Sequence, residues 1–380
     1  MAAGGSAGIK AGGVPDVAVV TTDDGRPVAA AGVFTGNLAA AAPVQISRAH
    51  LAATAGRAAG VILTSGNANA ATGEPGRLAA SSLCDAVATG IGARAEEILV
   101  CQTGLIGIPF PLDTVSPHLD AIISSRRRDP EAGAAAARAI MTTDTVPKVA
   151  LVSGQGFTVG AIAKGAAMLA PNMATMLALL TTDAVVDPVT LQTALRGAVD
   201  ASFNAMTVDG CTSTNDTVLV LASGRGSSPS PESLTAALRE ACTSLAEQMV
   251  DDAEGATKVA HIVVTGAESD AAAHRAARKV ADSMLVQCSL NGEDAYWGRV
   301  VSELGSAGVT FDIDTVSVAY GPVTVCAGGV AVAHDVTALA GHMAGRHIEI
   351  RCDLGVGSGS AAVLGTDLSY GYIDENRTTS

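Results

Sequence analysis

Short apolar runs alternate with amphipathic stretches along most of the chain. The runs are rich in Val, Ile and Leu, as buried strands are, whereas the stretches repeat apolar residues at helical spacing. The predicted strands are 16–22, 61–64, 98–101, 149–152, 217–222 and 259–265, and the predicted helices are 76–93, 112–124, 131–141, 188–202, 231–252 and 270–284. This alternation predicts an α/β chain with layered sheets and helices.

Two long stretches without charged residues approach the length of a membrane-spanning helix. Residues 165–182 are interrupted by Pro171-Asn172, and residues 315–333 alternate like strands around Gly321-Pro322. Neither has the uninterrupted ~20-residue apolar pattern of a lipid-facing helix. The first residues also lack the apolar core of a signal peptide. We therefore expect a soluble, cytoplasmic protein.

Composition and charge exclude some classes of function. Hydrophobic residues make up 48% of the chain, but there are only 5 Phe, 1 Trp and 4 Tyr, too few for a base-stacking platform. The net charge of −14 disfavours binding to a phosphate backbone. The charge is also uneven: residues 1–174 carry 12 basic and 12 acidic side chains, and residues 175–380 carry 11 and 25.

The familiar signatures of metal and hydrolytic sites are absent from the sequence. The 7 cysteines are scattered without a C-x-x-C pair, which predicts reduced, buried thiols rather than disulfides or a zinc site. There is no G-x-x-x-x-G-K-[ST], no G-x-S-x-G and no H-E-x-x-H. Gly355-Val-Gly357-Ser-Gly359 follows a strand-like segment and is better explained as a tight turn than as a phosphate-binding loop.

Four segments carry polar groups that could do chemistry. The most unusual is 163–177, in which Pro171-Asn172 interrupts an apolar run just before Thr175. From the pattern alone, a buried helix after a turn is favoured there, with Lys164 reaching solvent and Thr175 a core hydroxyl. The segment 102–107 is either a simple turn after a strand or an oxyanion site with a hydroxyl and a backbone N–H. Segments 140–145 and 251–258 each close a predicted helix.

Taken together, these segments resemble the ornithine acetyltransferase family of arginine biosynthesis over nearly the whole chain. The matching motifs are Ala7-Gly8-Ile9-Lys10, Gly32-Val33-Phe34-Thr35, Ser65-Gly66-Asn67-Ala68-Asn69-Ala70, Thr103-Gly104-Leu105-Ile106-Gly107, Met141-Thr142-Thr143-Asp144, Lys164-Gly165, Pro171-Asn172-Met173-Ala174-Thr175-Met176-Leu177, Asp209-Gly210, Ser213-Thr214-Asn215-Asp216, Glu254-Gly255-Ala256-Thr257-Lys258, Trp297-Gly298-Arg299 and Asp367-Leu368-Ser369-Tyr370. Each motif is weak alone, but their order and spacing make the assignment specific.

The resemblance implies a self-cleaving enzyme with the N-terminal-nucleophile fold of the DmpA and ornithine acetyltransferase type. The chain would cut itself between Ala174 and Thr175 into an α chain, 1–174, and a β chain, 175–380, which includes a smaller C-terminal α/β part from about 258. The freed α-amine, with a pKa of about 8, suits proton transfer from the Thr175 hydroxyl. Two copies of each chain would form a heterotetramer.

The implied reaction is a ping-pong transfer of acetyl from N-acetylornithine to glutamate through Thr175. The resemblance assigns Thr103 and Gly104 to the oxyanion, and it assigns substrate binding to Thr142, Lys164, Thr175, Glu254 and Asn376, with Thr379 or Ser380 as a final contact. Our own inference is that Lys164 binds the substrate α-carboxylate and Glu254 the ornithine ammonium. No metal or bound cofactor is implied, although acetyl-CoA is a possible second acetyl donor.

The sequence departs from the family pattern at four places. Ala167 replaces a second glycine after Lys164, Gln287 replaces a lysine, Tyr296 replaces an asparagine, and the C-terminal tail is about one residue shorter. Three alternatives therefore stay open. The chain could be a paralogue that uses the same chemistry in secondary metabolism. It could be an N-terminal nucleophile amidohydrolase or aminopeptidase that transfers acyl groups to water. It could also be a non-catalytic binding or assembly protein with the same fold.

Overall fold

The computed structural model describes residues 1–168 and 176–377. They form two compact units, which are described separately. The first unit comprises Met1–Asn204 and Thr212–Met249, and the second comprises Ala205–Cys211 and Val250–Ser380. Among the described residues there is no helix long and apolar enough to cross a membrane.

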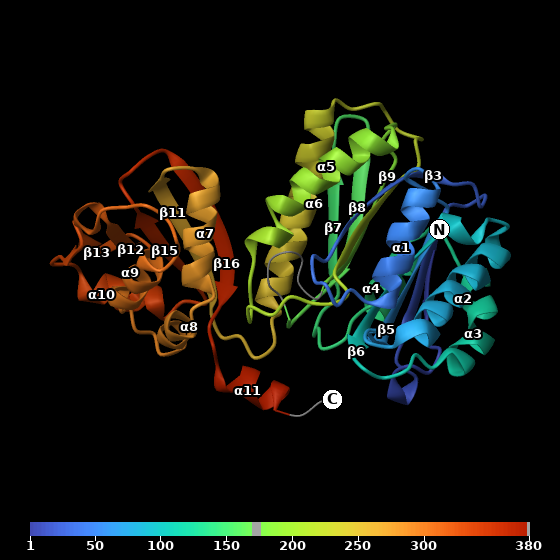
Figure 1. Ribbon diagram of the computed structural model, residues 1–380, viewed down its shortest axis with the longest axis horizontal. Helices are drawn as coiled ribbons and strands as arrows, with labels where there is room; N and C mark the ends of the chain where they lie inside the picture. The colour runs from blue at the N-terminus through green and yellow to red at the C-terminus, as the bar shows by residue number, and fades with distance from the viewer. Residues whose placement is uncertain (169–175, 378–380) are drawn as a thin grey trace. The chain divides into compact units, whose positions relative to one another are not determined.

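The first unit contains two sheets (Figure 1). The four-stranded sheet has the order β1-β2-β5-β6, with β1 (Ala2–Gly5), β2 (Val17–Thr21), β5 (Gly60–Asn67) and β6 (Ile98–Leu105). The six-stranded sheet has the order β4-β3-β10-β9-β8-β7, with β4 (Arg57–Ala58), β3 (Val28–Phe34), β10 (Thr217–Ala222), β9 (Leu177–Thr182), β8 (Thr158–Lys164) and β7 (Lys148–Ser153). β5 and β6 are parallel, as are β9 and β10.

An apolar layer joins the two sheets. Leu63 and Leu99 of the four-stranded sheet belong to the same buried cluster as Leu179 and Leu219 of the six-stranded sheet. Ile140, just after helix α4 (Pro130–Ala139), also belongs to this cluster. The side chains are aliphatic and small, so the sheets close on each other without aromatic filling.

Helices cover the outer faces of both sheets, which completes a helix–sheet–sheet–helix arrangement. On the four-stranded sheet lie α1 (Ala42–Ala53), α2 (Gly73–Ile91) and α3 (Leu112–Ser124). On the six-stranded sheet lies α5 (Pro188–Asp200), and beside it runs α6 (Pro231–Asp251), whose Gln248 bonds the backbone of Val149 at the β7 edge. The Asp187 side chain accepts bonds from Val189 N and Thr190 N, which confirms the predicted start of α5.

The second unit has one six-stranded sheet with helices packed against it. Its order is β14-β13-β12-β15-β11-β16, with β11 (Val259–Ala267), β12 (Ser317–Tyr320), β13 (Val323–Ala327), β14 (Val330–Ala331), β15 (His347–Asp353) and β16 (Gly359–Thr366). The helices are α7 (Asp270–Ala281), α8 (Met284–Asn291), α9 (Trp297–Gly305), α10 (Val336–Met343) and α11 (Tyr370–Asn376). Small residues on the buried face of α7 let it lie close to β11 and β16.

The structure corrects three expectations. The helix favoured within 163–177 lies partly outside the described residues, but its two ends are strand residues, with Lys164 ending β8 and Leu177 beginning β9. Lys164 does not reach solvent, because it is 3% exposed. The predicted helix 270–284 ends at Ala281, and Ser283 then caps a separate helix. Cys211 and Cys288 are exposed, whereas the other five cysteines are buried as expected.

Candidate active site

Thr103 and Gly104 lie near the C-terminal end of β6. Thr103 is 1% exposed, so its hydroxyl faces the protein interior. Gly104 has φ +129°, and a Cβ there would collide with the backbone of Gly66 and Asn67 on β5. Only glycine fits this backbone. The predicted oxyanion pair therefore occupies a rigid, crowded point of the sheet, which suits a preorganised donor site.

Asn215 fixes this point from the other sheet. Its Nδ2 donates to Gln102 O at 2.9 Å and to Ala68 O at 2.6 Å. Asn215 lies just before β10, whereas Gln102 is the β6 residue preceding Thr103. One buried amide therefore ties the beginning of β10 to the end of β6, which holds the Thr103 backbone in place.

Lys164 reaches this site from the last position of β8. It pairs with Leu177, the first residue of β9, and its Nζ lies 3.5 Å from Thr103 Oγ1. Lys164 is almost fully buried, and a buried ammonium is costly unless it has partners. Its charge next to the Thr103 hydroxyl favours negative charge on a reacting atom at that position.

Asp144 organises the loop that carries Thr142. Its Oδ1 accepts bonds from Lys148 Nζ at 2.6 Å and from Gly165 N at 2.7 Å, and its Oδ2 accepts one from Thr142 N at 2.9 Å. Burial opposes ionisation, but Lys164, Lys148 and these donors outweigh it and hold the pKa of Asp144 at about 2. One carboxylate thereby joins the Thr142 loop to the end of β8.

Met176 is the first described residue after the predicted cleavage bond. Its N donates to Asp216 Oδ1 at 3.1 Å, and its O accepts from Thr217 N at 3.1 Å. Asp216 is fully buried, and among the described residues its Oδ2 has no hydrogen-bond partner. Burial raises the pKa of Asp216 well above its usual value.

In the second unit, Glu254 and Asn376 form a hydrogen-bonded pair. Asn376 Nδ2 donates to Glu254 Oε2 at 2.7 Å and to Tyr372 O at 3.0 Å. Glu254 lies in the loop between α6 and β11, whereas Asn376 ends α11. Asn376 is exposed, and Glu254 is 9% exposed.

Asp367 joins two of the family motifs of this unit, Glu254–Lys258 and its own motif Asp367–Tyr370. It accepts bonds from Thr257 N, Thr257 Oγ1 and Lys258 N, all at 2.6–2.8 Å. Thr257 and Lys258 follow Glu254 directly, and Asp367 precedes α11. The loop that carries Glu254 and the helix that carries Asn376 are thus fixed to each other by one carboxylate.

The structure therefore brings Thr103, Gly104, Thr142 and Lys164 together in the first unit, and Glu254 and Asn376 together in the second. The predicted positions Ala174, Thr175, Thr379 and Ser380 lie outside the described residues. Within 1–168 and 176–377, no group of three or more His, Cys, Asp or Glu side chains is arranged to hold a metal ion. Of the family departures, Gln287 is buried and donates to Ala281 O, and Tyr296 lies under the Arg299 guanidinium.

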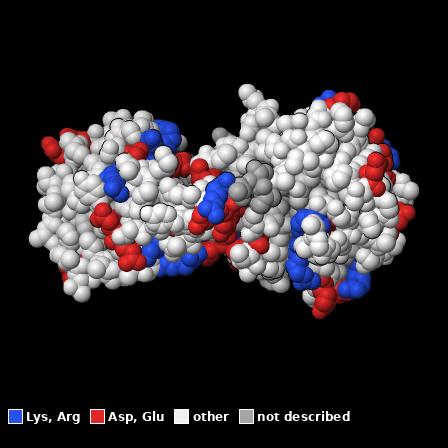
Figure 2. Space-filling view, turned by 90° about the horizontal axis from the view of Figure 1, so that it is seen from below, with Lys and Arg blue, Asp and Glu red and all other residues white. Residues whose placement is uncertain are grey.

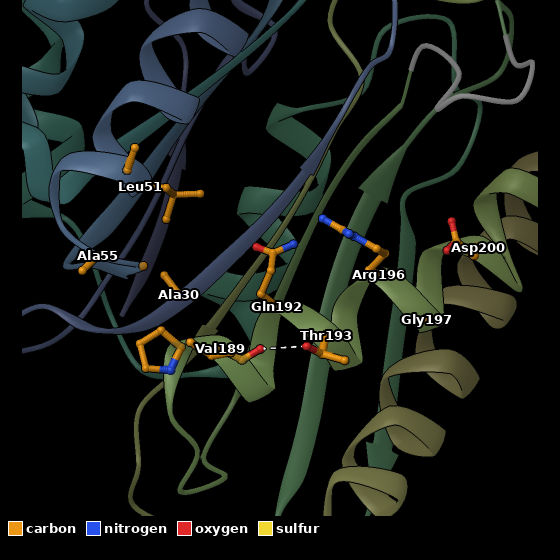
Figure 3. A pocket seen from close by; sticks show the side chains of 12 residues that line it. Ala30, Leu51, Ala55, Val189, Gln192, Thr193, Arg196, Gly197 and Asp200 are labelled. Carbon is orange, nitrogen blue, oxygen red and sulfur yellow. Dashed lines mark hydrogen bonds between the residues drawn. The ribbon is translucent and has the colours of Figure 1, made fainter.

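Two hollows in the first unit contain none of the predicted site residues. One, of 620 Å³, lies between the end of α1 and helix α5, where Gln192 bonds Gly32 N and O on β3 (Figure 3). The other, of 660 Å³, is lined by Thr21 and by Asp23 with its arginine partners Arg128 and Arg225. Figure 2 shows small scattered groups of charges on a mostly uncharged face, without a broad basic patch in this view.

Sequence reasoning assigned no role to Lys10, Asp144, Lys148, Asp216 or Asn215, although several lie in the matching motifs. Asp144 and Lys148 are spaced like an ordinary exposed i,i+4 pair. For Asp216, the sequence does contain a local signal. This acidic residue directly precedes the apolar strand Thr217–Ala222. Asp216 is buried like the strand that it precedes, and burying a carboxyl group is costly unless it serves a purpose in the fold or the site.

Comparisons with known proteins identify the family. The ArgJ family model matches residues 1–378. The arginine biosynthesis bifunctional protein ArgJ of Thermobifida fusca is 44% identical over 100% of this chain and 97% of its own length. The protein of the same name from Mycolicibacterium paratuberculosis is 46% identical over 100% of this chain and 94% of its own.

Two solved structures are also similar to this chain. A crystal structure of ArgJ from Bacillus halodurans is 34% identical with a TM-score of 0.50, and covers 52% of this chain and 96% of its own. The ornithine acetyltransferase of Mycobacterium tuberculosis, complexed with ornithine, is 38% identical with a TM-score of 0.40, and covers 45% of this chain and 90% of its own. The predicted family and α/β fold class are confirmed: the chain belongs to the ArgJ family, the ornithine acetyltransferases of arginine biosynthesis.

Proposed function

We propose that this acyltransferase moves acetyl from N-acetylornithine to glutamate by a ping-pong reaction in which Thr175 carries the acetyl group. The observation that carries the proposal is the buried cluster in which Lys164 contacts Thr103, with Met176 held by hydrogen bonds to Asp216 and Thr217 at the start of β10. This arrangement offers oxyanion donors, a cation and a fixed residue adjoining the nucleophile, which acyl transfer needs.

The nucleophile is generated by self-cleavage between Ala174 and Thr175. None of the described histidines hydrogen-bonds to this cluster, so the α-amine released at Thr175 takes the hydroxyl proton. A chain division of this kind agrees with the B. halodurans structure, whose chain matches over 96% of its own length but covers only 52% of this one. The products are chains of 174 and 206 residues.

In the first half-reaction, the Thr175 hydroxyl attacks the acetyl carbonyl and its proton passes to the α-amine. The negative charge on the carbonyl oxygen is stabilised by the Thr103 hydroxyl and the Gly104 N–H, with Lys164 adding a positive charge nearby. Collapse of this intermediate expels ornithine, which takes up the proton. In the second half-reaction, the glutamate amine attacks acetyl-Thr175, and the same groups act in reverse order.

Two side chains of opposite charge recognise different groups of the substrate. Lys164 binds the α-carboxylate that both substrates share, and the Thr142 loop, held by Asp144, lines the same region. Glu254 binds the ornithine ammonium, with Asn376 fixing the carboxylate orientation. Thr379 or Ser380 completes the contact. The ornithine bound to the M. tuberculosis relative agrees with this substrate class.

Further elements of the proposal follow from the family alone. The enzyme works in the cytoplasm as a heterotetramer of two α and two β chains, without a metal. The word bifunctional in the relatives' names supports acetyl-CoA as a second acetyl donor for glutamate. The competing hydrolytic function differs only in the acceptor, which would be water.

Two measurements on the purified protein test this function. An intact mass spectrum should show two chains that begin at Met1 and Thr175 in place of one chain of 37.6 kDa. With labelled N-acetylornithine, the acetyl group should appear on glutamate. Free acetate alone would establish the hydrolase, and an intact, inactive chain would establish the non-catalytic alternative.

The Thr175→Ala variant completes the test. It removes only the hydroxyl, so the chain should fold, remain uncut and transfer no acetyl. Thr181→Ala is the matched control, because Thr181 lies on β9 with an exposed side chain. A Thr175→Ala protein that is still cut at the same bond would overturn the mechanism.

A further inference from the structure

A second lysine lies at the predicted oxyanion site. Lys10 Nζ donates to Met141 O at 3.0 Å, which places the ammonium on the loop that carries Thr142. A Cβ on Gly66 would lie 2.9 Å from Lys10 Cγ, so the lysine stem packs directly on Gly66. Gly66 pairs with Gly104 across β5 and β6. Lys10 therefore lies beside the same backbone that presents the oxyanion donors.

The Lys10 ammonium keeps bonding capacity for a ligand. It has three N–H donors, and one of them is used by Met141 O. Among the described residues it has no carboxylate within salt-bridge distance. The two nearest acids are engaged elsewhere: Asp16 accepts the backbone N–H of Ala7, Ile9 and Lys10, and Asp144 is held by Lys148. Lys10 is half-buried, so a ligand can reach it.

Charged side chains of both signs surround Lys10. Burial lowers the pKa of Lys10, Asp16 and Asp144 raise it, and Lys164 lowers it. The ammonium groups of Lys10 and Lys164 therefore lie within electrostatic range of each other, and a carboxylate bound at Lys10 is attracted by Lys164 as well.

The two substrates of the proposed function differ in their number of carboxylates. N-acetylornithine has one, next to the acetylated nitrogen, whereas glutamate has that same carboxylate and a second at the end of its side chain. Lys164 accounts for the shared group. The side-chain carboxylate of glutamate then needs a cation of its own, which N-acetylornithine does not need.

We propose that Lys10 binds the side-chain carboxylate of glutamate and so selects the acetyl acceptor in the second half-reaction. This inference rests on the proposed function, because it presupposes acetyl transfer to glutamate. It adds a subsite in the first unit that holds one substrate and leaves the other untouched. The contact is a charge-assisted hydrogen bond from Nζ to a carboxylate oxygen.

The test compares Lys10→Met with wild type in the two half-reactions. Lys10→Met should raise the KM for glutamate by about tenfold to a hundredfold, as expected for losing one hydrogen bond between charged groups. The single-turnover release of ornithine from N-acetylornithine, measured without glutamate, should stay within about twofold. Lys10→Arg keeps the charge and should restore most of the affinity, and Arg26→Met controls for removal of a surface cation.

Glutamine separates a binding role from a structural one. It has the same shape as glutamate but no side-chain charge, so the wild-type preference for glutamate over glutamine in kcat/KM should fall toward one in Lys10→Met. If the preference is unchanged while both acceptors lose activity, Lys10 only supports the Met141 loop and the proposal is wrong. Slower ornithine release would also overturn it, assigning Lys10 to the shared carboxylate. If wild type transfers no acetyl at all, the proposed function itself fails.

Discussion

The two groups of site residues are held in different ways. In the first unit, Asp144 receives three hydrogen bonds from within 3 Å and lies inside the protein beside two buried lysines. In the second unit, the Glu254 carboxylate has Asn376 as its partner, and that partner is exposed. The difference indicates that buried charges fix the proposed chemical centre of the first unit, whereas the proposed recognition pair of the second unit has one exposed member.

The strongest test of this difference removes the carboxylate of Asp144. Asp144→Asn removes the negative charge that the fully buried Lys148 ammonium contacts at 2.6 Å, so we expect the free energy of unfolding to fall by about 3–5 kcal/mol. Thermal melting of the variant measures it. Asp24→Asn breaks an exposed contact with Arg26 and should leave Tm unchanged. Equal losses in both variants would show that the Asp144 cluster is not held by its charges.

The pH dependence of stability follows from the same group. The folded-state pKa of Asp144, about 2, lies below its unfolded value, so its stabilisation is complete above about pH 4 and is lost as pH falls toward 2. As pH falls from about 4 toward 2, the Tm of Asp144→Asn should therefore decrease less than the Tm of wild type.

A second test separates chemistry from binding in the first unit. Thr103→Val keeps the side-chain volume but removes the hydroxyl that faces Lys164. We expect kcat to fall about 10²–10³-fold with little change in the KM for either substrate, as for the loss of one oxyanion donor. Steady-state kinetics measures the split. A large rise in KM with unchanged kcat would instead assign Thr103 to ground-state binding.

The matching test in the second unit should give the opposite pattern. Glu254→Gln keeps the bond from Asn376 but removes the negative charge, so the KM for N-acetylornithine should rise about tenfold while kcat changes little. Glu375→Gln on the exposed side of α11 is the control. If Glu254→Gln lowered kcat as strongly as Thr103→Val, the proposed division between the units would be wrong.

The smallest expected effect concerns Asp216. Because its folded-state pKa is raised, the native protein binds a proton that the unfolded chain releases, and stability falls as pH rises above about 4. Asp216→Asn mimics the neutral acid and can still accept from Met176 N. The Tm of the variant relative to wild type should therefore increase from pH 4 to pH 8. A constant difference across that range would mean that Asp216 is ionised in the folded protein.

The parts of the fold that the sequence predicted are those with a clear local signal. Helix 112–124 was predicted at its observed limits because its apolar stripe is regular and strong. β9 was missed because it lies inside a sheet and is buried on both faces, so its apolar run has no alternation that distinguishes a strand from a helix. The family motifs assigned roles in the site to Thr103, Lys164 and Glu254, and all three side chains are buried.

The rest of the site depends on tertiary contacts that no local pattern contains. The i,i+4 spacing of Asp144 and Lys148 is typical of a solvent-exposed pair. In the structure both side chains are buried, which makes them a fixed ion pair. Lys10 and Met141 are 131 residues apart in the sequence, so nothing local connects them. Such contacts form only in the folded protein, so the sequence alone does not predict them.

The order of strands in the six-stranded sheet has a consequence for the processed enzyme. β9 and β10 follow the proposed cut and lie between β3 and β8, which precede it. The two polypeptides are thus interleaved within one sheet. Separating them would require breaking the backbone hydrogen bonds of two strand pairs, β3–β10 and β8–β9. Halves produced as independent genes should consequently fail to dock as preformed bodies and would have to fold around each other.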